Sequence, residues 1–259
     1  MGNRSIAMDA AKGGFVVAMI AYHACYVAVM FGLSGIDLFS GFWWVFPRTI
    51  AAGFVALSGW NLAAKRARGG SLGAFARRAG TLALVALAIS AATYPVLRSG
   101  FVFFGVIHLL AVSSLLAYPL LGRPAAAMAV GAAFLAAGLA LGARRFGFPW
   151  LAWLGLRPAN LYPADYLPLA PWFAFAAFGA AARDLAARAA EARGAAEARG
   201  AAKTKRAAGA GRAGGATNPA PAAARALAFL GRHSLAVYLI HLPLLYGIGW
   251  AVSALLGEA

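Results

Sequence analysis

Residues 13–33 read GGFVVAMIAYHACYVAVMFGL and contain no charged side chain. A helix of about 20 apolar residues crosses the hydrocarbon core of a membrane, which is about 30 Å thick. The run is too long for the apolar region of a signal peptide, and no clear small-residue cleavage site accompanies it. We therefore expect this segment to stay in the protein as its first membrane span.

Six further apolar runs follow along the chain. They are Phe42–Ala64, Ala76–Leu97, Phe101–Leu121, Ala125–Leu141, Tyr166–Ala182 and Leu235–Leu256. Hydrophobic residues make up 63% of the 259 residues and charged residues only 12%, whereas soluble domains carry about a quarter charged residues. Since a span in lipid satisfies its backbone hydrogen bonds internally, each run should be helical. The sequence predicts an all-α, multi-pass transmembrane helical bundle of about seven spans.

Positive charge is distributed unevenly between the two sides of such a bundle. If the N-terminus is inside, all but five of the 23 lysines and arginines fall in inside segments. The five on the outside are Arg48, Arg98, Arg144, Arg145 and Arg157. Basic residues accumulate in cytoplasmic loops, so the asymmetry favours N-inside and C-outside. It also accounts for the net charge of +16 without a nucleic-acid partner.

The segment 186–224 differs in composition from the rest of the chain. It is rich in Ala, Gly and Arg and lacks the large apolar residues with which a helix packs. We expect a flexible, basic cytoplasmic linker, with contact to anionic lipid headgroups as an alternative. Residues 1–185 then hold the first six spans, and residues 225–259 hold the last span of the same membrane domain.

Three histidines lie inside predicted spans, where ionisable side chains are costly and often functional. They are His23, His108 and His241, on three different runs. If these spans face one another, the imidazoles share a cavity. Histidine titrates near neutral pH and can deprotonate an attacking amine or carry an acyl group. The alternative is that each one is a neutral residue that hydrogen-bonds between helices.

Two other polar positions are candidates for binding or chemistry. His233 follows Arg232 at the cytoplasmic entrance to the last span, where it could position a phosphate or simply start a solvated helix. Asp165 opens the sixth span, where it could contact substrate or pair with an arginine. The single cysteine, Cys25, predicts no internal disulfide, and no Cys/His spacing resembles a zinc site. Walker A, HExxH and GxSxG motifs are absent from the sequence, and no dinucleotide fingerprint follows a strand.

Five motifs, taken in order, resemble those of a known family. They are Arg4–Gly14 running into Tyr22-His23, then Phe54–Gly59, Phe104–His108, Asp165–Trp172 and Leu230–His241. Together they are similar to the bacterial branch of the heparan-alpha-glucosaminide N-acetyltransferase catalytic-domain family, and more distantly to membrane acyltransferases that modify sugars. The resemblance covers nearly the whole chain except the linker.

The resemblance implies transfer of an acetyl group from acetyl-CoA, as co-substrate and without a metal, to an amine or hydroxyl of a sugar-like acceptor. It places the protein in a bacterial cytoplasmic (inner) membrane, in contact with lipid and a small-molecule or glycan acceptor. The catalytic candidates are His108 with His23 or His241, and Asp165. The candidates for the CoA phosphates are Lys12, Arg77, Arg78, Arg232 and His233. Lys12 stands where the family commonly has Arg, so bidentate phosphate binding is lost there.

Two other classes of function remain open from the sequence. A proton-coupled transporter or exporter could use the same histidines as a relay, although no internal repeat of the kind common in transporters is visible. A non-catalytic membrane scaffold would need none of them. The oligomeric state is not indicated by the sequence.

Overall fold

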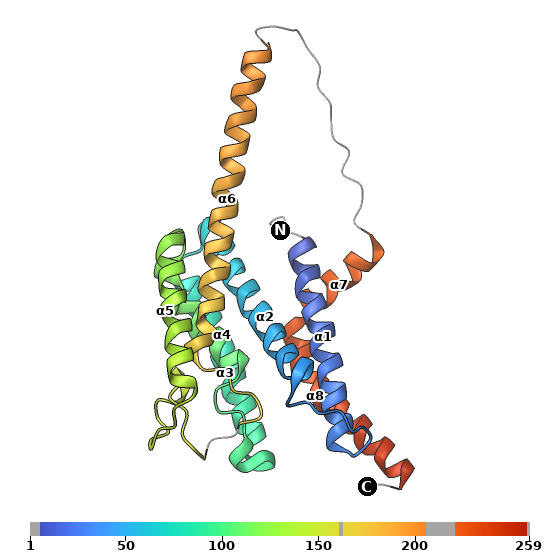
Figure 1. Ribbon diagram of the computed structural model, residues 1–259. Coiled ribbons are helices and arrows are strands. Elements are labelled where there is room, and N and C mark those ends of the chain that lie inside the picture. The colour runs from blue at the N-terminus through green and yellow to red at the C-terminus, as the bar shows by residue number, and fades with distance from the viewer. Residues whose placement is uncertain (1–5, 161–162, 206–220, 258–259) are drawn as a thin grey trace. The chain divides into compact units, whose positions relative to one another are not determined.

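The computed structural model describes residues 6–160, 163–205 and 221–257, and its regular elements are helical (Figure 1). The α-helices are α1 (Ile6–Met30), α2 (Gly41–Ala67), α3 (Leu72–Leu97), α4 (Val106–Leu116), α5 (Pro124–Gly142), α6 (Leu169–Lys205), α7 (Ala222–Arg232) and α8 (Ser234–Leu256). Three short 3-10 helices are η1 (Arg98–Gly100), η2 (Tyr118–Leu120) and η3 (Ala152–Leu154). Two isolated bridges are the only β pairing within these residues. The all-α prediction is confirmed.

Four helical segments in the described part of the chain have the length and apolar composition to cross a membrane. They are α1, α3 extended through η1 to Gly100, α5 and α8. Helix α4 is apolar but has only 11 residues, which at 1.5 Å per residue span about 16 Å. Helices α2 and α6 coincide with predicted runs as well, but polar residues within them lower their hydropathy.

Two helices differ in extent from the apolar runs that predicted them. Helix α4 begins at Val106 rather than at Phe101, because Gly105 before it is extended and residues 101–105 connect α3 to α4. Helix α6 continues to Lys205, through the first part of the predicted linker, since Ala, Arg and Glu are strong helix formers. The remaining linker residues 206–220 lie outside the described residues.

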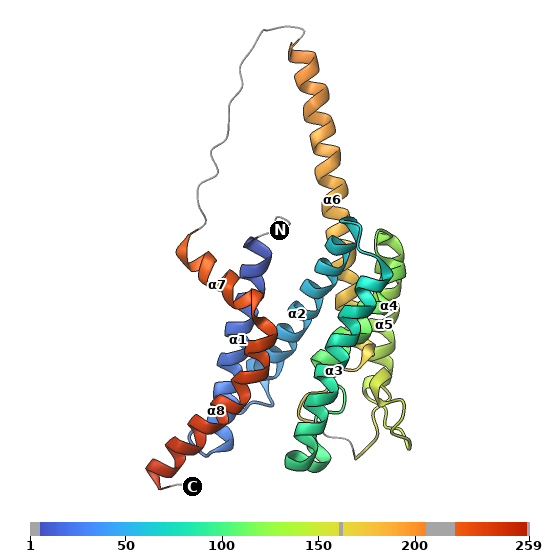
Figure 2. The ribbon, with the colours of Figure 1, turned by 180° about the vertical axis from the view of Figure 1, so that it is seen from behind.

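The chain divides into two compact units, and the boundary falls inside α2. The terminal unit comprises Met1–Phe54 and Gly215–Ala259, and the central unit comprises Val55–Gly214. In the terminal unit, α1 packs against both α7 and α8, as two opposite views show (Figures 1 and 2). In the central unit, α5 runs beside α6, and α3 beside α4 (Figures 1 and 2).

Helices α1 and α7 touch through their backbones at two glycines. A Cβ built on Gly13 of α1 would collide with the carbonyl of Leu227, and one on Gly231 of α7 would collide with the carbonyl of Asp9. Apolar helices in lipid gain little from hydrophobic burial against one another, so close approach through small residues is a common way to associate. Gly13 and Gly231 therefore hold the first and last motifs of the chain together.

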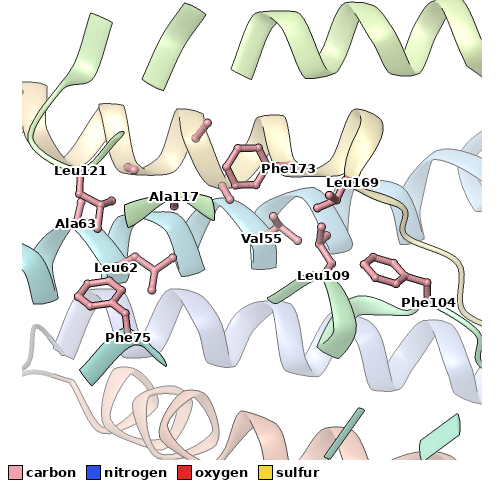
Figure 3. Packing of buried hydrophobic residues seen from close by; sticks show 13 residues of the cluster. Val55, Leu62, Ala63, Phe75, Phe104, Leu109, Ala117, Leu121, Leu169 and Phe173 are labelled. Atoms are coloured by element: carbon pink, nitrogen blue, oxygen red, sulfur yellow. The ribbon is translucent and has the colours of Figure 1, made fainter. Parts of the chain in front are cut away.

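The core of the central unit is a cluster of apolar side chains from several helices (Figure 3). Val55 and Leu62 of α2 lie with Phe75 of α3, Leu109 of α4 and Phe173 of α6, and each is at most 2% exposed. The helices approach closely where side chains are small. A Cβ on Gly59 would strike the backbone of Ala176, and one on Gly179 would strike that of Ala56.

Hydrogen bonds to two charged side chains of α6 hold the turn that leads into α5. Gly122, with a φ of +82°, stands in the left-handed region that glycine tolerates. Its N–H donates to Asp184 of α6 at 2.7 Å, and its carbonyl accepts from Arg188 at 3.2 Å. The Asp184 carboxylate is buried and also pairs with Arg183 at 3.1 Å. The charged side chains near the middle of α6 therefore help to hold the central unit together.

We predict that Gly13→Ala destabilises the protein by about 1–3 kcal/mol, because the added methyl must displace the α7 backbone. Gly14→Ala is the matched control, since no atom lies within 4 Å of the position its Cβ would take. That control should be neutral or slightly stabilising, as alanine is favoured over glycine in helices by up to about 1 kcal/mol. The apparent Tm of the detergent-purified proteins measures both. Equal values for the two variants would contradict the proposed contact.

Candidate functional site

His23 and His241 form a pair in the terminal unit. His23 lies in α1 and His241 in α8, and their ring centroids are 4.9 Å apart with an edge-to-face angle of 73°. His241 is only 5% exposed, whereas His23 is partly buried. The structure thus brings together two of the three predicted histidines.

Hydrogen bonds define which nitrogen of each ring carries the proton. Nδ1 of His23 lies 2.8 Å from the carbonyl oxygen of Met19, and Nδ1 of His241 lies 2.7 Å from that of Tyr238. A carbonyl can only accept, so both Nδ1 atoms are donors in these bonds. In the neutral rings, Nε2 then keeps its lone pair. Nε2 of His241 is buried and has no hydrogen-bond partner among the described residues.

An apolar pocket of about 250 Å³ adjoins this pair. It is lined by Ile20 of α1 and, from α8, by His241 with Ala236, Val237, Ile240, Leu244 and Leu245. Buried polar atoms in proteins are normally hydrogen-bonded, so an exception calls for an explanation. The lining of the pocket is apolar, so Nε2 of His241 lies behind its wall, and a group in the pocket could give this lone pair a proton after a small side-chain movement.

His108 lies in the central unit, and both of its ring nitrogens are occupied. Nδ1 accepts from the N–H of Gly105 at 3.2 Å, which leaves the ring proton of neutral His108 on Nε2. Nε2 lies 3.1 Å from Oγ of Ser90 on α3, which therefore accepts. Ser90 in turn donates to the carbonyl of Val102 at 2.7 Å. The Ser90 hydroxyl is thus not activated as a nucleophile, and His108 ties α4 to α3.

Asp165 holds the same helix end from the other side. Its Oδ2 accepts from the N–H of Val106, the first residue of α4, at 3.0 Å. A Cβ on Gly105 would collide with this carboxylate, so glycine is required for the approach. Amides in the first turn of a helix have no partner within it, and Asp165 and His108 satisfy two donors at this end of α4. The bond from Leu167 N–H to the Phe104 carbonyl, 2.9 Å, joins the same two motifs.

The two neighbouring arginines of α3 have different surroundings. Arg78 donates to Oγ of Ser114 on α4 at 3.1 Å and to Oγ of Ser58 on α2 at 3.2 Å. It therefore connects three helices of the central unit through a partly buried guanidinium. Arg77 is exposed, and its side chain makes no hydrogen bond or ion pair among the described residues.

The remaining predicted site residues lie in the terminal unit. Lys12 is partly buried in α1, immediately before Gly13. Arg232 ends α7 and is exposed, and it lines a second pocket of about 250 Å³ with Arg225. His233 between α7 and α8 is exposed, bonds through Nδ1 to the Phe229 carbonyl at 2.9 Å, and packs on the Phe229 ring at 4.4 Å.

Several polar partners in these clusters were not identified from the sequence. They are Ser90, Ser58, Ser114 and Arg225. The three serines were visible as hydroxyls inside apolar runs, but only the folded chain gives them partners. Within residues 6–160, 163–205 and 221–257, no three His, Cys, Asp or Glu side chains gather as a metal site would require.

Comparison with known families gives one match. The model of the family described as heparan-alpha-glucosaminide N-acetyltransferase, catalytic, matches residues 4–243. No curated protein and no solved structure matches the chain. The matched region includes all five motifs, and it favours acetyl transfer over the transporter and scaffold alternatives. The chain therefore belongs to the heparan-alpha-glucosaminide N-acetyltransferase catalytic family, a family of membrane acetyltransferases.

Proposed function

We propose that the protein transfers acetyl from acetyl-CoA to an amine or hydroxyl of a sugar-like acceptor, with the His23–His241 pair as the base. The observation that carries this proposal is the buried, unpartnered Nε2 of His241 beside an apolar pocket. The acceptor nitrogen or oxygen forms the new bond to the acetyl carbon, the thioester bond breaks, and CoA leaves as its thiolate. The imidazole takes the proton that the acceptor loses.

The two histidines of the pair have complementary parts in this proposal. Both present an Nε2 lone pair, because both Nδ1 atoms donate to the carbonyl of a preceding turn. Once His241 takes a proton, the neighbouring neutral ring of His23 can stabilise the charge that results. The apolar pocket would receive the methyl group of the acetyl unit and keep water from the thioester.

His108 and Asp165 have a positioning role in this proposal. Their hydrogen bonds fix the N-terminus of α4 and leave no lone pair on a neutral His108 ring for the acceptor. The cationic residues Lys12, Arg77, Arg78, Arg232 and His233 are candidates for the phosphates of the donor. Arg77 and Arg232 are the exposed arginines of this set, whereas Arg78 is engaged by two serines.

The membrane context completes the proposal. We place the protein in a bacterial cytoplasmic membrane, with about seven spans, the N-terminus inside and the C-terminus outside. Helices α1, α3, α5 and α8 have the composition of spans, and α2, α4 and the first half of α6 coincide with the other predicted runs. The acceptor is a glycan or small molecule in contact with this membrane.

Asparagine substitutions separate the two kinds of histidine. We expect His241→Asn and His23→Asn to lower the transfer rate about 100-fold or more, because the side-chain amide can replace the Nδ1 donor but not the Nε2 base. His108→Asn should keep most of the activity, since its amide oxygen can accept from Gly105. The measurement is transfer of radiolabelled acetyl from acetyl-CoA to glucosamine and to a bacterial envelope-glycan extract. Full activity in both His23→Asn and His241→Asn would exclude the pair as the base.

Cysteine labelling tests the proposed orientation. In a Cys25→Ala background, Asp37→Cys lies in the exposed connection between α1 and α2, and Arg68→Cys in that between α2 and α3. A membrane-impermeant maleimide added to intact cells should label the first cysteine and leave the second unlabelled until the cells are lysed. The reverse pattern would invert the topology, and labelling of both in intact cells would remove α2 from the spans.

A further inference from the structure

Helix α7 presents a cationic and aromatic face beside its contact with α1. Leu227, Ala228 and Gly231 face α1 or are buried, whereas Arg225, Phe229 and Arg232 are exposed. Positions 225, 229 and 232 recur at helical spacing and so share one side of α7. Arg225 and Arg232 also line the pocket of about 250 Å³ whose other walls are Ile6 and Ala228.

We propose that this pocket binds a phosphate-bearing anion through Arg225 and Arg232. Neither guanidinium has a hydrogen bond or ion pair within the part of the chain that the structure describes, and no acidic side chain lines the pocket. The two residues are seven positions apart, or about 10 Å along the helix. Two long arginine side chains can reach across this distance to the same anion. Planar guanidinium groups bind phosphate oxygens in pairs, with better geometry than lysine.

The position of Arg225 strengthens the case for an anion. Cations are favoured near the C-terminus of a helix, so the helix dipole by itself explains Arg232 in the last turn of α7. Arg225 lies near the N-terminal end, where the same dipole opposes a positive charge. An anion between the two arginines removes that conflict and their mutual repulsion.

A phosphate at this pocket can come from two sources. The donor nucleotide of the proposed acetyl transfer is one, and Phe229, which is 56% exposed and tilted against the His233 ring, offers an aromatic surface beside the arginines for its base. A lipid headgroup is the other, with Phe229 entering the apolar layer instead. Only the nucleotide source rests on the proposed function. The shared requirement is a phosphate held by both arginines.

Binding measurements on the full-length protein in uncharged detergent test the pocket. Arg225→Gln and Arg232→Gln should each weaken binding about tenfold, either to CoA or to phosphatidylglycerol added in micelles of the same detergent. Arg193→Gln is the matched control, since it removes one exposed positive charge from α6 in the central unit. Arg225→Lys, which keeps the charge but loses the planar fork, should fall between the wild type and Arg225→Gln.

The outcomes separate the sources and the two proposals. If the variants lose affinity for CoA alone, and lose less for dephospho-CoA, the pocket binds the nucleotide. If they lose affinity for phosphatidylglycerol alone, the pocket binds lipid. Unchanged binding of both, or an equal loss in Arg193→Gln, overturns the pocket even if acetyl transfer is observed. Binding that depends on both arginines without acetyl transfer by the wild type would reject the proposed function and keep the pocket. Equal apparent Tm values show that the variants are folded.

Discussion

The backbone contact between α1 and α7 at Gly13 and Gly231 determines the geometry of the terminal unit. Helix α7 ends at Arg232 and α8 starts at Ser234, so fixing α7 on α1 also fixes where α8 begins. Further along, Gly249 of α8 packs against the side chains of Val27 and Phe31. His23 and His241 lie between these two contacts. Their approach therefore follows from close packing at both ends rather than from any attraction between the imidazoles.

Polar side chains in this apolar chain fall into two groups, and the distinction bears on function. Arg78, Ser114 and His108 use their polar atoms to join helices of the central unit. Removing such a partner would leave a buried group unsatisfied, which costs about 1–3 kcal/mol. His241 is different, because only one of its nitrogens is used in this way. A donor or acceptor that a folded protein leaves unused in its interior is more informative about chemistry than one that is satisfied.

The helices were largely predictable, because a long apolar run has few alternatives in lipid. Their ends were less so. The start of α4 depends on Asp165, 59 residues further along the chain than Val106, and local sequence does not reveal that bond. Likewise, the apolar runs identified three histidines inside predicted spans but did not show which of them are neighbours. His23 and His241 come together through the packing of glycines on helices that are far apart in the sequence. The motifs that are far apart in the sequence contact one another in the fold. The first motif contacts the last, and Phe104–His108 contacts Asp165–Trp172.

The terminal unit therefore contains two features of the proposed chemistry on one continuous stretch of chain. The arginine pocket lies on α7, and His241 lies nine positions beyond Arg232, about 13 Å further along if the rise of α8 is counted throughout. An acyl-CoA carries its phosphates and its thioester at opposite ends of a flexible arm. Phosphates held on α7 would leave that arm free to extend along α8 toward the apolar pocket. In this arrangement the glycine contact that fixes α7 on α1 would set the distance between the site for the phosphates and the site for the thioester. Helix packing, donor binding and acyl transfer would then all depend on Gly13 and Gly231.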